Sequence, residues 1–160
     1  MWPRVEGLRA FSFGGPGEMR GRLTQLALTG AKVATAGLLH REYLEEGESV
    51  EQVGERQALI GDDGRVVTFV EITRVEVHAF ADVPWEFAEA EGEGFRSIEH
   101  WRESHKTYYR ELSVEVDDST PVVCVWFALV DVQGPGSDRE PRASTTRVTF
   151  SLGREETVRD

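Results

Sequence analysis

The chain has 160 residues, a single cysteine and a formal net charge of -11. This length predicts one domain, and the lone Cys124 excludes an intrachain disulfide framework and predicts a reducing, cytoplasmic location. The negative charge argues against sequence-blind binding to nucleic acid, which depends on neutralising phosphates, although it is compatible with a local basic groove or a nucleoside pocket. We expect no membrane partner, because no apolar stretch approaches the ~18 residues of a membrane helix and the N-terminus lacks the apolar segment of a signal peptide.

The first predicted element is a helix near the N-terminus. Apolar residues recur there at helical spacing on one face: Met19, Leu23, Leu26 and Ala27. We expect this helix to begin at Pro16 or Glu18 and to end at Thr29. Gly30 is then well placed to cap it, so that Lys32 follows just after the helix end.

A hairpin is predicted further along the chain. Residues 33–39 are small and apolar and fit either a first strand or a short helical turn. The strongly acidic stretch 42–63 is typical of a solvated face. Within and after it, a strand over residues 57–60, a tight turn over 62–64 and a longer strand over 65–77 form the predicted hairpin. The apolar phase of the longer strand shifts part-way along it, which indicates a β-bulge.

Two helices and a buried strand are predicted in the second half. Residues 84–90 fit a short helix, which an acidic, Gly-rich turn over 91–94 ends. Ser97 is suited to cap a second helix that runs to about Leu112. Residues 122–132 form a nearly continuous apolar run, as expected of a central strand that is covered on both faces.

These elements predict an α+β fold. Helices flank antiparallel strands without the strand–helix alternation of a doubly wound sheet, which indicates a small mixed fold on a curved sheet or barrel. We place this domain in residues 1–133. Residues 134–160 predict a linker and a C-terminal extension, which is either a flexible tail or an edge strand formed by the alternating apolar residues at 146–152.

Two segments far apart in the chain carry most of the candidate chemistry. Lys32 lies three residues before Thr35, and the Gly-rich turn carries Glu91 and Glu93. An amine, a hydroxyl and a carboxylate are sufficient for acyl-transfer chemistry, and also for gripping a polar ligand such as a nucleobase. The alternatives are that Lys32 interacts with a helix dipole, that Thr35 is an ordinary strand residue and that the carboxylates are solvated.

The second helix carries candidate ligand-binding residues. Four of its side chains are able to stack a base: Trp101, His105, Tyr108 and Tyr109. Helical spacing also fits burial of Trp101 and Tyr108 in the core, and His105 fits either a satisfied buried histidine or a proton carrier. Basic residues fit either a local rim or an ion-paired helix surface: Arg41, Arg96, Arg102, Lys106 and Arg110. Because the histidines show no metal-ligand spacing and no phosphate-binding glycine loop is present, we expect no metal and no cofactor.

Four segments together resemble the ASCH domain family. They are FGGPGEMRGRLTQLALTGAKVATAGLL with its G-x-K-x-x-T pattern, VGERQALIGDDGRVVTFVEITRVEV, FAEAEGEGFRSIEHWRESH and PVVCVWFALV. The resemblance covers roughly residues 8–132. The resemblance implies a PUA-like, mixed or antiparallel β-barrel with flanking helices. It also implies one of several functions: removal of the acetyl group from N4-acetylcytidine by an amidohydrolase, ribonuclease activity, or RNA binding.

The resemblance assigns roles to particular residues. The family's K-x-x-T pattern falls on Lys32 and Thr35, and the glutamate of its A-E-x-E segment falls on Glu91; these three are the implied catalytic residues. From the residue types and their spacing, and not from the resemblance, we expect the substrate-binding residues to be Glu93, Trp101, His105, Tyr109 and Arg41. The chain departs from the family where it has Phe95 in place of an acidic residue and Lys106 in place of an aromatic one.

The chemical roles and the function stay open at this point. Lys32 activates Thr35 if it is neutral, or stabilises an oxyanion if it is charged. Glu91 activates water or protonates a leaving amine. We expect a nucleobase, nucleoside or RNA pocket, with hydrolysis of the amide of an N4-acylated cytidine as the leading function; the alternatives are a non-catalytic RNA-binding module and a ribonuclease.

Overall fold

The computed structural model describes residues 1–130. The domain end expected at residue 133 and the extension expected over 134–160, with its strand at 146–152, lie outside the described residues. Within residues 1–130, no helix is long and apolar enough to cross a membrane.

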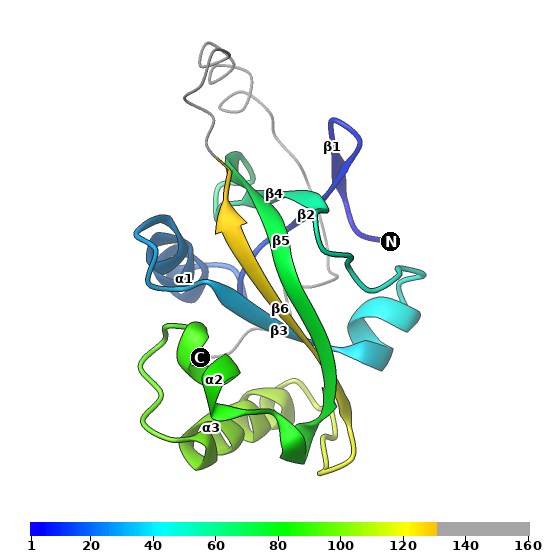
Figure 1. Cartoon of the computed structure of the whole chain (residues 1–160), viewed down its shortest axis with the longest axis vertical. Helices are drawn as coiled ribbons and strands as arrows, with labels where there is room; N and C mark the ends of the chain where they lie inside the picture. Colours follow the sequence, from blue (N-terminus) through cyan, green and yellow to red (C-terminus); the bar gives the residue numbers. More distant parts are fainter. Residues whose placement is uncertain (131–160) are drawn as a thin grey trace.

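A six-stranded mixed sheet forms the centre of this part of the chain (Figure 1). Its strands are β1 (Arg4–Val5), β2 (Leu8–Phe11), β3 (Ala34–Leu38), β4 (Arg56–Ile60), β5 (Val66–Ala79) and β6 (Pro121–Leu129). They lie in the order β1-β2-β4-β5-β6-β3, and neighbours are antiparallel except β2 and β4, which are parallel. With its helices, this sheet confirms the expected α+β fold.

The described sheet is open rather than closed into a barrel. β1 and β3 stand at the two ends of the strand order. β1 has only 2 residues, and the Leu38 N–H on β3 donates to the carboxylate of Glu42 at 3.1 Å instead of to a further strand. The curved sheet is therefore present, and the barrel closure that we expected is not confirmed.

Three α-helices flank the sheet in the described part of the chain: α1 (Glu18–Leu28), α2 (Trp85–Ala90) and α3 (Ile98–Glu111). Their predicted ends are confirmed. Gly30 has a φ of +89° just after α1, and Ser97 Oγ accepts a hydrogen bond from the His100 N–H at the start of α3 (3.0 Å). A 3-10 helix, η2 (Phe80–Asp82), joins β5 to the α2 segment. α2 and α3 lie together at one end of the sheet (Figure 1).

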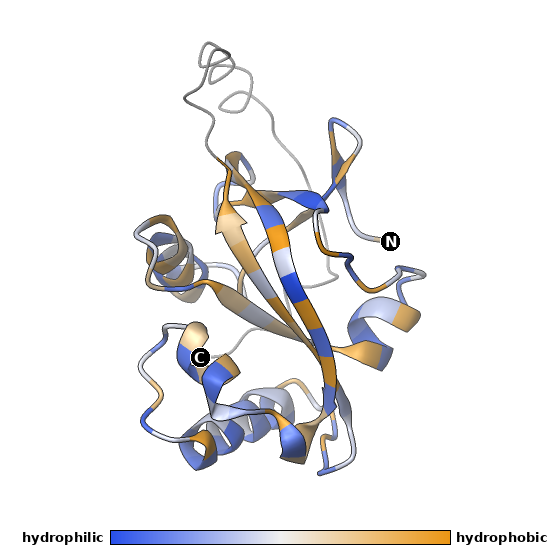
Figure 2. Ribbon diagram, viewed as in Figure 1, coloured by the Kyte–Doolittle hydropathy of each residue, from blue (hydrophilic) through white to orange (hydrophobic). Residues whose placement is uncertain are grey.

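The hairpin is formed by β4 and β5. The turn between them closes through a hydrogen bond from the Gly61 N–H to Arg65 O (2.9 Å). The register of β5 against β6 shifts between Ile72 and Arg74, which confirms the predicted bulge. Hydrophobic and hydrophilic residues alternate along much of β5 (Figure 2).

The acidic stretch 42–63 is not simply a solvated face, and this expectation was wrong. A π-helix that the sequence did not predict, η1 (Leu39–Leu44), begins before this stretch and includes its first residues. Three of its carboxylates are buried: Glu42, Glu48 and Glu51. Each accepts at least one hydrogen bond from the protein; Glu51, for example, accepts from Tyr43 Oη (2.9 Å) and Gln57 Nε2 (3.3 Å).

Strand β6 separates two hydrophobic cores. One core contains Trp2, Phe11, Phe13, Leu23, Ala27, Tyr43, Val123, Val125 and Phe127, among others. The second contains Ala34, Ala36, Phe80, Phe87, Trp101, Tyr109, Val122, Cys124 and Trp126, among others. Alternate residues of β6 thus enter opposite cores, and this confirms the prediction of a central strand covered on both faces.

Candidate functional site

Lys32 enters the core directly after α1. Its backbone N–H donates to Leu26 O (3.0 Å), and the following N–H, of Val33, donates to Ala90 O at the end of α2 (2.9 Å). These bonds place the start of β3 between the C-terminal ends of α1 and α2. The Lys32 side chain is 0% exposed. Because a lysine is almost never fully buried without charged partners, its surroundings identify a candidate site.

The turn after α2 packs against the backbone of the Lys32 segment. Gly92 has a φ of +66°, and a Cβ at this position would overlap the carbonyl group of Ala31 and lie 3.0 Å from Lys32 Cα. Glycine is therefore required for this close approach. The approach directs Glu91 and Glu93, on either side of Gly92, toward the Lys32 amine.

The Lys32 amine lies between two carboxylates. Its Nζ donates to Glu93 Oε2 (2.6 Å) and to Ala34 O (2.9 Å), and Glu91 Oε2 lies 3.8 Å away. Both glutamate side chains are 0% exposed, and the Phe13 ring centroid is 5.1 Å from Nζ. A bond this short between an amine and a carboxylate is charge-assisted. The geometry therefore favours a charged Lys32, able to stabilise an anion, over a neutral base.

Glu91 is also held from helix α3. Its Oε1 accepts a hydrogen bond from Trp101 Nε1 (2.6 Å) and lies 3.9 Å from His105 Nε2. The His105 ring stacks on Trp101 with centroids 4.1 Å apart, and Tyr109 follows at 6.4 Å. These three residues are spaced by four along α3, so that one buried helix face supports the carboxylate.

Comparison with known proteins agrees with this fold. Residues 9–131 match the ASCH domain family. The chain belongs to the ASCH domain family. The solved ASCH domain from Lactobacillus crispatus JV V101 is 30% identical, with a TM-score of 0.65 over 75% of this chain and 77% of that one. Protein EF3133 from Enterococcus faecalis V583 is 27% identical, with a TM-score of 0.65 over 78% of this chain and 80% of that one. No curated protein matches the chain in sequence.

Two further expected site residues of this ASCH domain, Thr35 and Arg41, lie in β3 and η1. Thr35 is 3% exposed and pairs with Val125 across β3 and β6, so it faces the core that contains Phe13. Arg41 lies in η1 and lines a separate cavity of about 640 Å³ with Ser113 and other residues of the α3–β6 connection. The structure therefore brings Lys32 together with the two carboxylates and the aromatic face of α3, but it does not bring Arg41 to them.

Phe95 and Lys106, where the chain departs from the expected family pattern, differ in their position relative to the cluster of Lys32, Glu91, Glu93, Trp101 and His105. The Phe95 ring packs against His105 (5.7 Å between centroids), so this side of the cluster is apolar where the family often has an acid. Lys106 lies over the Phe80 ring at 5.8 Å, away from the carboxylates. Gly92 and the Ala34 carbonyl are site features that sequence reasoning missed. The signal for Gly92 was a glycine between two glutamates, which marks a turn with both carboxylates on it.

Cys124 is buried beside the cluster and has the packing role that the sequence predicted. Burial raises the pKa of its thiol, and the negative charge of Glu91 raises it further. A thiol in this environment is neutral and unreactive. Among residues 1–130, no group of three or more His, Cys, Asp and Glu side chains is arranged to hold a metal ion.

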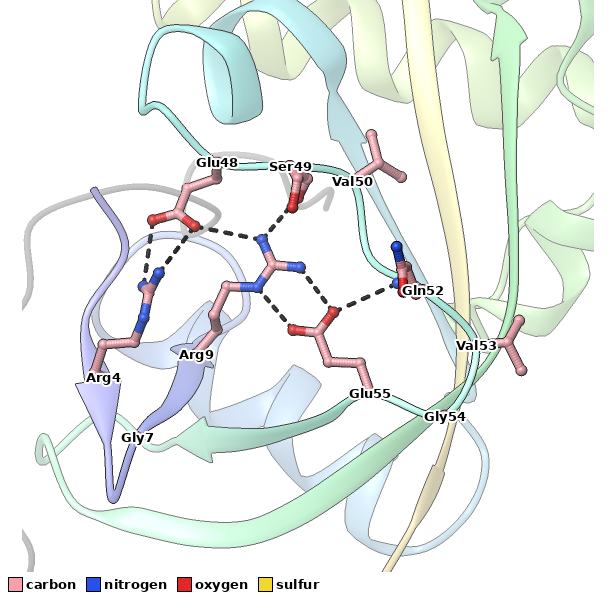
Figure 3. A pocket seen from close by; sticks show the side chains of 10 residues that line it. All are labelled: Arg4, Gly7, Arg9, Glu48, Ser49, Val50, Gln52, Val53, Gly54 and Glu55. Atoms are coloured by element: carbon pink, nitrogen blue, oxygen red, sulfur yellow. Dashed lines mark hydrogen bonds and ion pairs between the residues drawn. The ribbon is translucent and has the colours of Figure 1, made fainter.

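A second polar groove in the ASCH domain is occupied by its own ion pairs (Figure 3). Arg9 binds both oxygens of Glu55 (2.7 and 2.8 Å), and Arg4 binds Glu48 (3.2 Å). Burial by itself raises the pKa of Glu55, but hydrogen bonds from Arg9 and Gln57 outweigh it and hold this pKa below its usual range. These ion pairs join the N-terminal hairpin of β1 and β2 to the segment before β4, and we call this connection the N-terminal clasp.

Proposed function

We propose that this ASCH domain is an amidohydrolase that acts on an N4-acylated cytidine. The observation that carries the proposal is the fully buried Lys32 amine between Glu91 and Glu93, at the positions that match the family's pattern. A buried cation beside carboxylates is suited to acyl transfer by acid–base and electrostatic catalysis.

The proposed reaction divides the work between the charged groups. Glu91 accepts a proton from a water molecule while the oxygen of this water attacks the acyl carbon. The Lys32 ammonium stabilises the negative charge that forms on the carbonyl oxygen. When the C–N bond breaks, the electron pair leaves with the N4 nitrogen, which receives the proton from Glu91. The products are a carboxylic acid and the free amine of cytidine, so that one water is consumed.

Glu93 and Thr35 have supporting roles in this proposal. Glu93 fixes the Lys32 ammonium through the 2.6 Å bond, while the Ala34 carbonyl holds a second hydrogen of the same nitrogen. The Thr35 hydroxyl, three residues along the same segment, is assigned to the acyl group, either as a donor to its oxygen or as the nucleophile in place of water. Thr35→Val removes the hydroxyl with little change of shape and tests this assignment.

Substrate must enter through a movement of the protein. The side chains of Lys32, Glu91 and Glu93 are each 0% exposed, so a ligand reaches them only when a covering segment moves. Trp101 and Tyr109 are buried in the second core, and Trp101 is already bonded to Glu91. We therefore assign these two residues to supporting the site rather than to stacking the base of the substrate.

The test is release of cytidine from N4-acetylcytidine by the purified chain. Lys32→Met and Glu91→Gln keep the approximate shape of each side chain, and each should reduce kcat by roughly 10²-fold or more. Lys106→Met is the matched control, because this lysine is half-buried over the Phe80 ring, and kcat should be unchanged. Absence of turnover in the wild-type protein at high enzyme concentration, or equal turnover in Lys32→Met, would refute the proposal.

A second candidate, RNA binding without catalysis, is favoured by one surface feature. Three basic residues are spaced four apart and form a row along α3: Arg102, Lys106 and Arg110. Arg102 donates to Ala81 O (2.7 Å), which fixes one end of this row. Phosphate contacts by the row would make binding of RNA fall steeply with salt, and a charge-reversed triple variant would abolish it. Binding that does not depend on the row would exclude it as the interface.

A further inference from the structure

Strand β5 extends beyond β4, and this leaves part of one of its edges open. β4 pairs with β5 only as far as Glu71, and two hydrogen bonds of 2.8 Å then join Ile72 to Gly54 and Glu55. β5 continues to Ala79 and pairs there with β6 (Figure 1). In the described chain, residues 74–79 therefore have one paired edge and one unpaired edge.

Every second residue of this segment presents its backbone groups to the open edge. In an antiparallel pair, residues that bond the neighbouring strand alternate with residues that face away from it. The Phe80 N–H donates to Thr120 O, just before β6 (2.8 Å). Counting back from Phe80, residues 74, 76 and 78 face β6, whereas Val75 and Val77 face outward. The N–H and C=O groups of these two valines form no hydrogen bond among residues 1–130, so they are available to a further strand.

The other end of the sheet, at β3, is closed to a further strand. β3 is buried along its whole length. Its Ala34 O accepts from Lys32 Nζ (2.9 Å), and its Leu38 N–H donates to Glu42 Oε2 (3.1 Å). Side chains therefore cap the outward groups at both ends of β3. Nothing within residues 1–130 caps the open edge of β5 in this way, and the Val77 side chain on it is 48% exposed.

We propose that this edge pairs with the same edge of a second copy of the chain, with the two β5 strands antiparallel about a two-fold axis at Val77. A two-fold interface is self-complementary, so that each contact occurs twice. Val77 lies opposite Val77 of the second copy, Val75 opposite Ala79, and Glu76 opposite His78. In this register the outward backbone groups of the two strands meet and exchange hydrogen bonds.

Charge and space select this register over its neighbours. An axis one residue earlier in the chain would place the two Glu76 carboxylates directly opposite each other, which is unfavourable for like charges. An axis two residues earlier would place the end of the second β5 against Glu71, which β4 already pairs. With the axis at Val77, Glu76 faces His78 of the second copy. The Nε2 of His78 already bonds a carboxylate in its own chain, that of Glu76 (2.8 Å).

The contact is small, which determines how strong the pairing is. One short strand on each side buries less than the ~1,200 Å² of a stable interface, so we expect a dissociation constant of about 10⁻⁴ M. Backbone hydrogen bonds and the removal of the Val77 side chain from water both stabilise the pair.

The first test is sedimentation equilibrium of the full-length chain from about 10 μM to about 1 mM, which spans the expected constant. The wild type should change from monomer to dimer across this range. Val77→Lys sets two ammonium groups opposite each other at the axis and should weaken the dimer roughly 10-fold or more. Thr73→Lys is the matched control: it adds the same charge at another exposed position of β5, outside the paired residues, and should keep the wild-type constant.

The second test reads the register through a disulfide. The single native cysteine, Cys124, is 0% exposed, so an introduced surface cysteine is the thiol that reacts. Residues directly opposite each other in a hydrogen-bonded pair have Cα atoms about 5.5 Å apart, which is within reach of a disulfide. With oxidised glutathione, Val77→Cys should form a covalent dimer faster than Thr73→Cys does.

Three results would overturn the inference: a wild type that stays monomeric throughout the range, a dissociation constant unchanged in Val77→Lys, or equal cross-linking of the two cysteine variants. Slow hydrogen exchange of the Val77 amide in a monomeric chain would also overturn it, because another segment of the same chain would then cover the edge. None of these measurements uses a substrate, so their outcome is independent of whether the chain releases cytidine.

Discussion

The close approach of Gly92 to the Lys32 segment makes Gly92→Ala a severe test of how the site is assembled. The alanine Cβ would lie 2.5 Å from the carbonyl carbon of Ala31, whereas carbon atoms pack best at about 3.5–4.0 Å. The turn must therefore move by roughly 1 Å or more. A shift of this size lengthens the 2.6 Å bond between Lys32 and Glu93 beyond hydrogen-bonding range.

The loss in free energy of unfolding that we expect for Gly92→Ala has two separable contributions. Alanine at a φ of +66° costs about 1–2 kcal/mol, because its Cβ crowds the following carbonyl oxygen. Loss of a buried hydrogen bond between charged groups costs about 1.5–3 kcal/mol. Together they predict that the free energy of unfolding falls by about 2.5–5 kcal/mol, out of the 5–15 kcal/mol typical of a domain.

Gly94→Ala is the matched control for this experiment. Gly94 lies in the same turn with a φ of +92°, but no atom lies within 4 Å of the position its Cβ would take. It should lose only the conformational contribution. The assay is urea unfolding followed by near-ultraviolet circular dichroism, together with turnover of N4-acetylcytidine. Equal destabilisation by the two variants would refute the argument that backbone contact at Gly92 positions the carboxylates.

Three further predictions concern the surroundings of the site and the N-terminal clasp. Trp101→Phe keeps an aromatic ring but removes the indole N–H that donates to Glu91 Oε1, and should lower the free energy of unfolding by about 1.5–3 kcal/mol more than Trp126→Phe does in urea melts; equal losses in the two variants would contradict it. Cys124→Ser places a hydroxyl in the apolar second core and should destabilise the protein by about 1–3 kcal/mol more than Cys124→Ala does, as measured by urea unfolding; equal losses would count against the packing role. The pKa of Glu55 is lowered in the folded chain, so its contribution to stability is complete above the unfolded value of 4.5 and is lost as the pH falls through the folded value. The urea midpoint should therefore fall between pH 5 and pH 3, and this fall should be smaller in Arg9→Met; an unchanged pH dependence in that variant would show that the clasp is not its source.

The features that the sequence predicted well depend on neighbours in the chain. The end of α1 at Gly30, the cap of α3 at Ser97 and the bulge near Ile72 each arise from backbone preferences or from apolar periodicity within a few residues. The pairing of Lys32 with the carboxylates came from the family resemblance. Sequence spacing alone does not reveal a contact across 61 residues.

The features that sequence reasoning missed depend on distant partners or on the unpredicted η1. Glu48 reads as surface in an acidic stretch, but the Trp2 N–H donates to it across 46 residues of sequence. Glu42 reads the same way, but it accepts from the Leu38 N–H in the structure because η1 turns its side chain back onto β3. Arg41 was grouped with the site as part of a basic rim, whereas η1 places it in another cavity.

The alternation of β6 between the two cores has a consequence for how the molecule unfolds. Val125 contacts the core around Phe13 while its neighbour Cys124 contacts the core around Trp101, so neither core can loosen without disturbing the same strand. A shift of the β6 register by one residue would turn each of its side chains into the opposite core. We expect residues 1–130 to melt as one cooperative unit, and the Lys32 cluster, which both sides of this strand enclose, to be lost only when the whole domain unfolds.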